Sequence, residues 1–228
     1  RSSAASDVYK RQLYGYVDSD INYSVVDWLL ELKKILSQIE LKNKIPILVG
    51  GSGLYINAVI NGLVNIPLIS ETIKNQSLIK FNEVGIEKFR QINFQIDPRY
   101  MQNNNDKHRL LRAYGIFLQT KKNISFWYQQ PRVKTVNKNI YPFFITSERK
   151  SIYKKCEIRF EDMLAKGGID EVKKLHNSNI DRSLPISKSL GVKWLLSYLD
   201  NNISYEEAIK LSKRDTRRYV KRQFTWFK

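Results

Sequence analysis

The first strong pattern of apolar and polar positions along the chain is helical, and it begins at Ser24. Ser24 and Asp27 stand at the spacing of a capping box, with Asp in place of the usual Glu. Apolar residues then recur every three or four positions, at Val25, Leu29, Leu32, Leu36 and Ile39. This spacing predicts an amphipathic helix that packs one face into a core.

A short segment that is apolar on both faces follows at residues 45–49. Such a run is typical of a buried parallel strand. Gly50-Gly51-Ser52-Gly53 comes directly after it, and residues 54–60 read as a helix that ends near Gly62. The order of helix, strand, glycine-rich turn and helix predicts an α/β core. Residues 141–145 are predicted as the next strand.

The rest of the chain reads as helical. Residues 69–135 are poor in strand patterns, interleave basic and aromatic residues, and are predicted to form an inserted helical subdomain. The segments on either side, residues 13–68 and 136–228, are expected to form the two parts of the core, and residues 1–12 are interpreted as a non-native junction. After the second predicted strand, helices are expected at residues 151–166, at 169–176, at 187–199, and from about 205, where Ser204 and Glu207 have capping-box spacing.

The charge balance of the composition indicates a class of partner. Lys and Arg number 39 against 22 acidic residues, a formal net charge of +17. Such an excess attracts polyanions, so nucleic acid is the first partner to consider and an anionic membrane surface the second. No apolar run approaches the roughly 20 residues of a membrane span, and no basic-then-apolar leader is visible. We therefore expect a soluble, cytoplasmic protein.

The sequence contains few residues that could form a disulfide or bind a metal ion. Cys156 is the single cysteine, which excludes an internal disulfide. His108 and His176 are the two histidines, and this small donor set argues against a zinc site built by the protein.

The turn at residues 50–53 is the first segment with candidate chemistry. Glycines after a strand allow the backbone to approach a phosphate, and the N-terminus of the following helix offers free N–H groups. Ser52 adds a hydroxyl at the same place. The pattern fits an ordinary tight strand-to-helix turn equally well, so the turn alone decides nothing.

Two helices with basic faces are candidates for contact with nucleic acid. Arg109 and Arg112 are neighbours on one helix face, with Leu110 and Leu111 turned away from it, although a solvated charged face is the commoner meaning of such a pattern. The C-terminal helix is richer in charge. It carries a cationic stripe of Lys210, Arg214, Arg217 and Lys221, flanked by Arg218 and Arg222, beside an apolar stripe of Val220, Phe224 and Phe227. This second pattern favours contact with a nucleic-acid backbone.

Two further positions leave alternatives open. Arg159 could reach into a site or pair with Glu161 or Asp162, and its spacing favours pairing. Gly191 lies inside an apolar helical pattern, where it costs about 1 kcal/mol relative to Ala unless close packing or a ligand requires it.

Taken together and in order, five stretches resemble the tRNA dimethylallyltransferases, also called tRNA isopentenyltransferases. They are PILVGGSGLYINAVINGL, IDPRY with NNDKHRLLRAYGIF, RFEDMLAKGGIDEVKKL, SLGVKWLLSYLDNNISYEEAI and TRRYVKRQFTW. The resemblance covers most of the chain from Leu13 to Lys228. It implies an α/β fold with a P-loop-NTPase-like parallel-sheet core, an inserted all-helical tRNA-binding subdomain and a helical C-terminus.

The resemblance also implies a reaction and its partners. Enzymes of this family transfer a dimethylallyl group from dimethylallyl diphosphate to N6 of the adenine 3′ of the anticodon, position 37. The implied cofactor is Mg²⁺, which holds the diphosphate together with a glycine-rich P-loop, and an Asp acts as the general base. The implied partner is the anticodon stem-loop of a tRNA, bound by a monomer, with no membrane.

Residues of this chain that match family positions are expected to share their roles. Ser52 matches the position, usually Thr, that contacts the target nucleotide near the reaction centre, and Arg159 matches an Arg that assists departure of the diphosphate. The expected tRNA contacts are Ser52, Lys74, His108, Arg109, Leu110, Leu111, Arg112, Lys188, Ser189, Leu190, Gly191, Val192, Lys193, Lys221, Arg222, Gln223, Trp226 and Lys228.

The sequence also departs from the family pattern. It contains no G-x-x-x-x-G-K-[ST] string, and Ala4 stands where the catalytic Asp would precede Val8-Tyr9-Lys10. The first strand and the P-loop are therefore expected to be missing, and the chain is expected to be inactive by itself. Two rival interpretations remain: a non-catalytic RNA-binding protein, and another P-loop transferase or nucleotide kinase.

Overall fold

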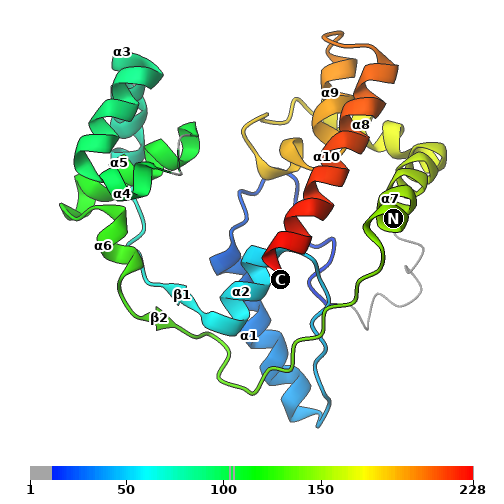
Figure 1. Cartoon of the computed structure of the whole chain (residues 1–228), viewed down its shortest axis with the longest axis horizontal. Coiled ribbons are helices and arrows are strands. Elements are labelled where there is room, and N and C mark those ends of the chain that lie inside the picture. The colour runs from blue at the N-terminus through cyan, green and yellow to red at the C-terminus, as the bar shows by residue number, and fades with distance from the viewer. Residues whose placement is uncertain (1–11, 103, 105, 228) are drawn as a thin grey trace. The chain divides into compact units, whose positions relative to one another are not determined.

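The computed structural model describes residues 12–102, 104 and 106–227, and it divides the chain into two compact units (Figure 1). Unit 1 comprises residues 1–60 and 135–228, and unit 2 comprises residues 61–134. The expected junction at residues 1–12 lies, apart from Gln12, outside the described residues.

Unit 1 begins with the helix that the apolar pattern predicts. Helix α1 (Val25–Leu41) starts with a complete capping box, in which the backbone N–H of Asp27 donates to the Ser24 hydroxyl and the Ser24 N–H donates to the Asp27 carboxylate. Its apolar face is buried at Leu29, Leu32 and Leu36. Helix α2 (Gly53–Asn61) follows the glycine-rich turn and contacts α1 through the rings of Trp28 and Tyr55. The predicted start of α1 is confirmed.

The two predicted strands of unit 1 are wrong. Residues 45–49 and 141–145 are irregular, and their side chains are largely exposed, with Ile45 88% and Ile145 95% accessible. A strand needs a neighbouring backbone to satisfy its N–H and C=O groups. No strand in the described part of the chain pairs with either segment, so the predicted parallel-sheet core is absent there.

The C-terminal part of unit 1 is helical. Its elements are α7 (Arg149–Met163), a π-helical turn (Leu164–Gly168), α8 (Ile169–Asn177), a 3₁₀ turn (Pro185–Lys188), α9 (Val192–Leu199) and α10 (Tyr205–Trp226). Helices α8, α9 and α10 share a small core of Val172, Leu195, Leu196 and Ala208. Ser204 caps α10 by accepting a hydrogen bond from the Glu207 N–H at 3.2 Å, as its spacing predicts.

The helix predicted over residues 187–199 is broken at Gly191. This residue has φ +86°, a value that residues with a side chain rarely adopt, and it separates the 3₁₀ turn from α9. A Cβ at this position would lie 2.9 Å from Cε2 of Phe160, which is buried. Close packing against α7 and a positive φ thus both require the glycine, which is the alternative that the sequence left open.

Unit 2 is a helical bundle with a small antiparallel sheet. Helix α3 (Glu71–Ile96) is kinked at Gly85 and packs on α5 (Lys107–Thr120), with the short helices α4 (Pro98–Met101) and α6 (Ile124–Tyr128) beside them. Two clusters form its core, Phe89, Met101 and Leu110 in one and Ala113, Ile116 and Ile124 in the other. Strands β1 (Leu63–Val64) and β2 (Arg132–Val133) pair with each other. Strand β2 falls within residues 69–135, which were expected to be all-helical.

Candidate nucleic-acid interface

The glycine-rich turn of unit 1 lies against the C-terminal end of α10. The side-chain amide Nε2 of Gln223 donates a 2.8 Å hydrogen bond to the carbonyl oxygen of Gly51. Two residues further on, a Cβ built on Gly53 would lie 2.5 Å from Cδ2 of the Trp226 indole. Ser52 stands between these two contacts and is half-buried. The fold therefore brings together three predicted site residues, Ser52, Gln223 and Trp226.

These contacts explain two glycines of the turn without reference to a ligand. A Cβ on Gly51 would collide with the Gln223 amide, just as one on Gly53 would collide with the indole. Gly50, in contrast, has no atom within 4 Å of the position of a Cβ. Packing against the Trp226 ring thus requires Gly53, whereas a Cβ on Gly51 would displace the end of the flexible Gln223 side chain. Ser52 is held where α10 ends.

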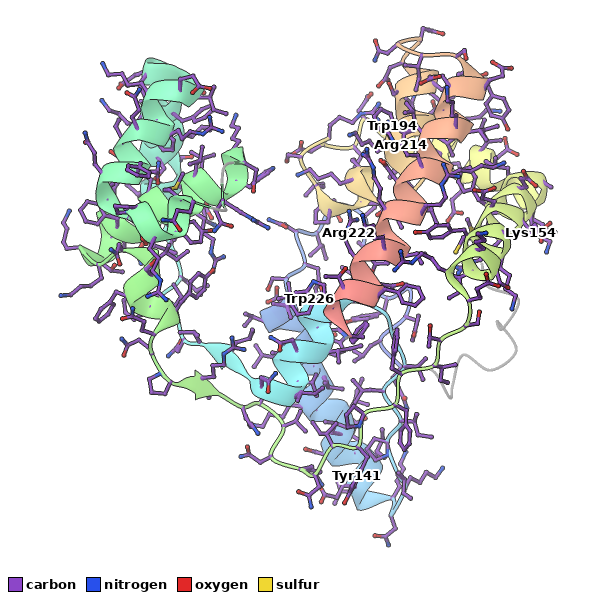
Figure 2. All side chains as sticks on the ribbon, in the orientation of Figure 1. Tyr141, Lys154, Trp194, Arg214, Arg222 and Trp226 are labelled. Atoms are coloured by element: carbon purple, nitrogen blue, oxygen red, sulfur yellow. The ribbon has the colours of Figure 1, made fainter. Side chains whose placement is uncertain are left out.

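An aromatic cluster anchors the same end of α10. The ring of Phe144 packs against Phe224 and Phe227, with centroids 6.1 and 5.3 Å apart, and the guanidinium of Arg149 lies 5.4 Å from the Phe224 ring. Val220 is buried one turn earlier. The apolar stripe predicted for this helix is confirmed. Trp226 itself stays 54% exposed. Figure 2 labels its position at the end of α10.

Some cations of α10 form ion pairs with acidic residues of α7, and others are exposed. Arg217 forms an ion pair with Glu157 of α7, and Lys213 forms one with Glu161, which also lies on α7. The charge of Arg217 is therefore partly neutralised, which the stripe pattern did not foresee. Lys221 and Arg222 are exposed, and the Arg222 guanidinium lies over the ring of Tyr219 at 5.5 Å.

The segments at residues 188–193 and 221–228, predicted separately as tRNA contacts, meet at one cavity of about 720 Å³. Among the predicted contacts, Lys188, Leu190, Lys193 and Arg222 line this cavity. Ser189 is exposed, Val192 is half-buried and Gly191 is buried, so Gly191 shapes the backbone here and is not available for the predicted contact. Lys228 lies outside the described residues.

A polar network that the sequence did not suggest borders the cavity. The indole Nε1 of Trp194 donates to the Asp215 carboxylate at 2.8 Å, and Arg214 Nε contacts the other carboxylate oxygen at 3.3 Å. Burial acts to raise the pKa of Asp215, but the hydrogen bonds from Trp194 and Arg214 and the charges of Arg214 and Arg218 outweigh it, so the pKa is lowered. Figure 2 shows Trp194 and Arg214 together on α9 and α10. One feature of the sequence could have drawn attention to this network: Asp215 is the only acidic residue after Glu207.

Arg159 does not form the ion pair that its spacing favours. It is exposed on α7, and within the described residues neither Glu161 nor Asp162 pairs with it. Glu161 binds Lys213 instead. The side chain of Arg159 thus remains accessible to an anion.

Unit 2 carries the remaining predicted contacts, at the start of α5. Asp106 caps the helix by accepting from the Arg109 N–H at 3.1 Å, and the Arg109 guanidinium binds both Asp106 and Asn104. His108 and Arg112 are exposed. Leu110 is completely buried between α3 and α5, so its predicted role as an RNA contact is corrected to a packing role, and Leu111 is half-buried.

Two other features of unit 2 bear on its charge. Lys74, near the start of α3, pairs with Glu71 at 2.6 Å, and its side chain stays 54% exposed. Burial and the neighbouring Tyr128 raise the pKa of Tyr100 to about 12, although the charges of Arg109 and Arg112 act in the opposite direction. Tyr100 is therefore neutral beneath the cationic start of α5.

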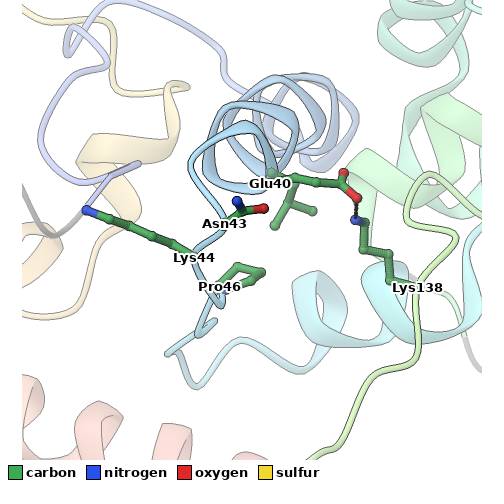
Figure 3. A pocket seen from close by; sticks show the side chains of 6 residues that line it. Glu40, Asn43, Lys44, Pro46 and Lys138 are labelled. Carbon is green, nitrogen blue, oxygen red and sulfur yellow. Dashed lines mark ion pairs between the residues drawn. The ribbon is translucent and has the colours of Figure 1, made fainter.

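A second cavity of unit 1, of about 260 Å³, is bordered by the end of α1 and the segment that follows it (Figure 3). An ion pair between Glu40 and Lys138 closes one side. The cavity contains none of the predicted site residues, and its charges are mixed.

Comparison with protein families shows which family the chain belongs to. A family model described as IPP transferase matches residues 2–228. The chain belongs to the IPP transferase family. The match includes residues 2–12, the segment interpreted above as a non-native junction.

Curated relatives from this family carry one name. The chain is 38% identical over 218 residues to the tRNA dimethylallyltransferase of Ehrlichia ruminantium (strain Welgevonden), covering 95% of this chain and 73% of that protein. It is 40% identical over 220 residues to the tRNA dimethylallyltransferase of Wolbachia sp. subsp. Drosophila simulans (strain wRi), covering 95% and 74%. The chain thus spans about three quarters of the length of these relatives.

Solved structures from the family share its fold. The tRNA isopentenylpyrophosphate transferase of Bacillus halodurans aligns with a TM-score of 0.62 at 31% identity, over 95% of this chain and 67% of that one. A eukaryotic dimethylallyltransferase acting on tRNA aligns with a TM-score of 0.74 at 23% identity, over 93% of this chain and 55% of that one, and supports the fold alone.

Two further properties of this IPP transferase chain concern metals and membranes. In the described residues, no group of three or more His, Cys, Asp or Glu side chains is placed to hold a metal ion. Of the helices described, none combines the length and the apolar character that a bilayer span requires.

Proposed function

We propose that the chain belongs to an enzyme that transfers a dimethylallyl group from dimethylallyl diphosphate to N6 of adenine 37, 3′ of the tRNA anticodon. The observation that carries the proposal is the meeting of the Ser52 turn with Gln223 and Trp226 of α10. A hydroxyl, a tethered amide and an exposed indole from distant segments converge there in a chain whose relatives are tRNA dimethylallyltransferases.

The reaction defines what these side chains must do. A bond forms between adenine N6 and C1 of the dimethylallyl group, the bond from C1 to oxygen breaks, and diphosphate leaves with the electron pair. N6 then loses a proton to a base. The adenine must leave the base stack to be reached. Ser52 contacts the target nucleotide, and the indole of Trp226 offers a face on which a nearby base stacks.

The leaving group needs positive charge. Arg159 is exposed on α7 and unpaired among the described residues, so its guanidinium is available to a departing diphosphate. A divalent cation, Mg²⁺ by the family resemblance, would also stabilise the negative charge of the departing diphosphate. The described residues offer no cluster of acidic or histidine ligands for such an ion, so the proposal assigns no residue of this chain to it.

The grip on the anticodon stem-loop comes from exposed cations in each unit. In unit 1 these are Lys188, Lys193, Lys221 and Arg222, and in unit 2 they are Lys74, Arg109 and Arg112, with the exposed His108 beside them. Contacts of this type hold phosphates and fix the register of the RNA without reading its bases. The enzyme is proposed to act in the cytoplasm as a monomer.

Activity is tested with labelled dimethylallyl diphosphate and an anticodon stem-loop RNA. The 228 residues contain no G-x-x-x-x-G-K-[ST] string, so the chain alone is expected to bind this RNA but not to modify it. A longer version that supplies such a string and the catalytic Asp is expected to prenylate the RNA. Failure of that longer version, with the RNA bound, contradicts the proposed function. Turnover by the chain alone would contradict its inactivity.

A non-catalytic tRNA-binding protein is the rival interpretation. The DNA that encodes the chain separates the two. A P-loop and an Asp encoded in frame upstream of Leu13 support the enzyme, whereas a start codon at that point supports the binding protein.

A further inference from the structure

The 720 Å³ cavity of unit 1 is lined by two arginines that the family resemblance does not assign to tRNA contact. Arg182 lies in the segment between α8 and the 3₁₀ turn, and Arg218 lies on α10. Both side chains are exposed. Lys188, Lys193 and Arg222 complete the cationic lining, against the carboxylates of Asp200 and Asp215. Five cations therefore face two acids across one cavity.

Each of the two acids has more than one partner. Asp200 accepts from Arg182 Nη2 at 2.9 and 3.1 Å and also contacts His176 Nε2 at 2.8 Å. Asp215 accepts from Trp194 and from Arg214. Each carboxylate is thus shared, and neither cancels the charge of one arginine completely.

Arg218 is oriented by Asp215 but not enclosed by it. Its Nη1 lies 3.7 Å from the Asp215 carboxylate, beyond hydrogen-bonding distance, and its side chain is 63% exposed. Exposed ion pairs of this kind are worth at most about 1 kcal/mol, so a phosphate can displace the carboxylate easily. Arg182 likewise is 44% exposed while it binds Asp200. Both guanidinium groups keep N–H donors free to turn toward an anion.

The arrangement fits a chain of phosphates better than one small anion. The cations come from two separate segments, residues 182–193 and α10, and their side chains are exposed along an open cavity instead of converging on one enclosed point. A nucleic-acid backbone presents successive phosphates to such a surface, and arginine binds each of them with parallel N–H donors.

We propose that this cavity binds the phosphate backbone of the tRNA, with Arg182 and Arg218 as phosphate contacts that Asp200 and Asp215 position. The inference rests on the proposed function, because it takes tRNA as the substrate. It adds two contacts, and a positioning role for the Trp194–Asp215 network, to the residues assigned by resemblance.

The test measures how binding of a fluorescent anticodon stem-loop to the 228-residue chain depends on salt. Arg182→Gln and Arg218→Gln are each expected to reduce the slope of log K against log [salt] by about 0.7–0.9, the value for one lost phosphate contact. Arg182→Lys and Arg218→Lys keep the charge and are expected to keep most of the slope. Lys154→Gln is the matched control, since Lys154 is an exposed cation on α7 outside the cavity, and it is expected to leave the slope unchanged (Figure 2).

The outcomes separate this inference from the function on which it rests. Unchanged slopes for both Gln variants, with a normal circular dichroism spectrum, would overturn the phosphate site while leaving the tRNA preference of the parent chain intact. Variants that bind inorganic diphosphate more weakly but RNA normally would make the cavity a small-anion site, which also overturns the inference. A parent chain without preference for tRNA would instead contradict the proposed function.

Discussion

The side-chain amide of Gln223 donates a 2.8 Å hydrogen bond to the carbonyl oxygen of Gly51, which lies 172 residues earlier in the chain. This bond fixes the last turns of α10 against the turn that carries Ser52. A Cβ on Gly51 would displace the amide at the end of the Gln223 side chain, so this hydrogen bond depends on the glycine. The position of Ser52 therefore depends on the C-terminal helix.

A double-mutant cycle tests this dependence. Gln223→Ala removes the bond, and Gly51→Ala displaces the amide, so each variant is expected to lose about 0.5–1.5 kcal/mol of unfolding free energy. The double variant is expected to lose little more than either single variant, because both remove the same contact. Urea denaturation measures the values. Gln38→Ala, at an exposed position of α1, is the control and is expected to stay within about 0.5 kcal/mol of the parent. Fully additive losses would contradict the coupling.

Gly191 is expected to be among the least replaceable glycines of unit 1. Gly191→Ala introduces a side chain at φ +86° and places its Cβ 2.9 Å from the buried Phe160 ring. Backbone strain of this kind costs about 1–3 kcal/mol, before the ring has to move. Thermal unfolding measures the loss. Gly50→Ala is the matched control, because no atom lies within 4 Å of its Cβ and its φ is not positive. Equal melting temperatures for the two variants would show that the turn at Gly191 is not constrained.

The capping box of α1 predicts a dependence of stability on pH. Hydrogen bonds from the Ser24 hydroxyl and from the Ser24 N–H lower the pKa of Asp27 in the folded chain. As the pH falls, the unfolded chain binds this proton first, so the contribution of Asp27 is complete above about pH 4 and is lost as the pH falls through the lowered folded-state pKa.

The measurement compares urea unfolding of the parent and of Asp27→Asn at pH 7 and at pH 3. The variant is expected to be about 0.3–1 kcal/mol less stable at pH 7, the usual contribution of an exposed acidic residue in the first turn of a helix, and the difference is expected to shrink at pH 3. Ser37→Ala, in the middle of α1, serves as the control whose effect does not change with pH. A difference for Asp27→Asn that persists undiminished at low pH would count against the capping role.

Trp226 is expected to contribute to RNA binding through its ring. Its indole is 54% exposed beside Gly53, and stacking of one base on an aromatic ring is worth about 1–3 kcal/mol. Trp226→Ala should weaken binding of an anticodon stem-loop by that amount, whereas Trp226→Phe should retain most of the affinity. Fluorescence anisotropy measures both variants, with Lys154→Gln as a surface control. Equal affinities for the Ala and Phe variants would argue against stacking.

Local features of the fold could be predicted from the sequence. The caps at Ser24 and Ser204 depend on residues three positions apart, and both form as expected. The strands predicted at residues 45–49 and 141–145 would need partner strands elsewhere in the chain. An apolar pattern does not reveal whether such partners are present. Gly191 was recognised as unusual, but its reason, the ring of Phe160, comes from another helix.

The candidate site shows the same division between local and distant information. Spacing placed Arg217 on a cationic stripe but could not reveal Glu157 of α7, which pairs with it. The family resemblance supplied Ser52 and Gln223 as separate contacts, and only the fold joins them through Gly51. The family resemblance supplied Leu110 as a tRNA contact, whereas helical spacing alone turns it away from the basic face, and its side chain faces the core of unit 2.

The central claim is that the cationic helices of this chain bind the anticodon arm of a tRNA. Competition binding at about 0.15 M salt, with a labelled anticodon stem-loop displaced by either the same unlabelled RNA or an unrelated hairpin of equal length, tests it most directly. The account predicts at least about a tenfold preference for the anticodon stem-loop, or roughly 1.4 kcal/mol. Equal displacement by the two RNAs would contradict it.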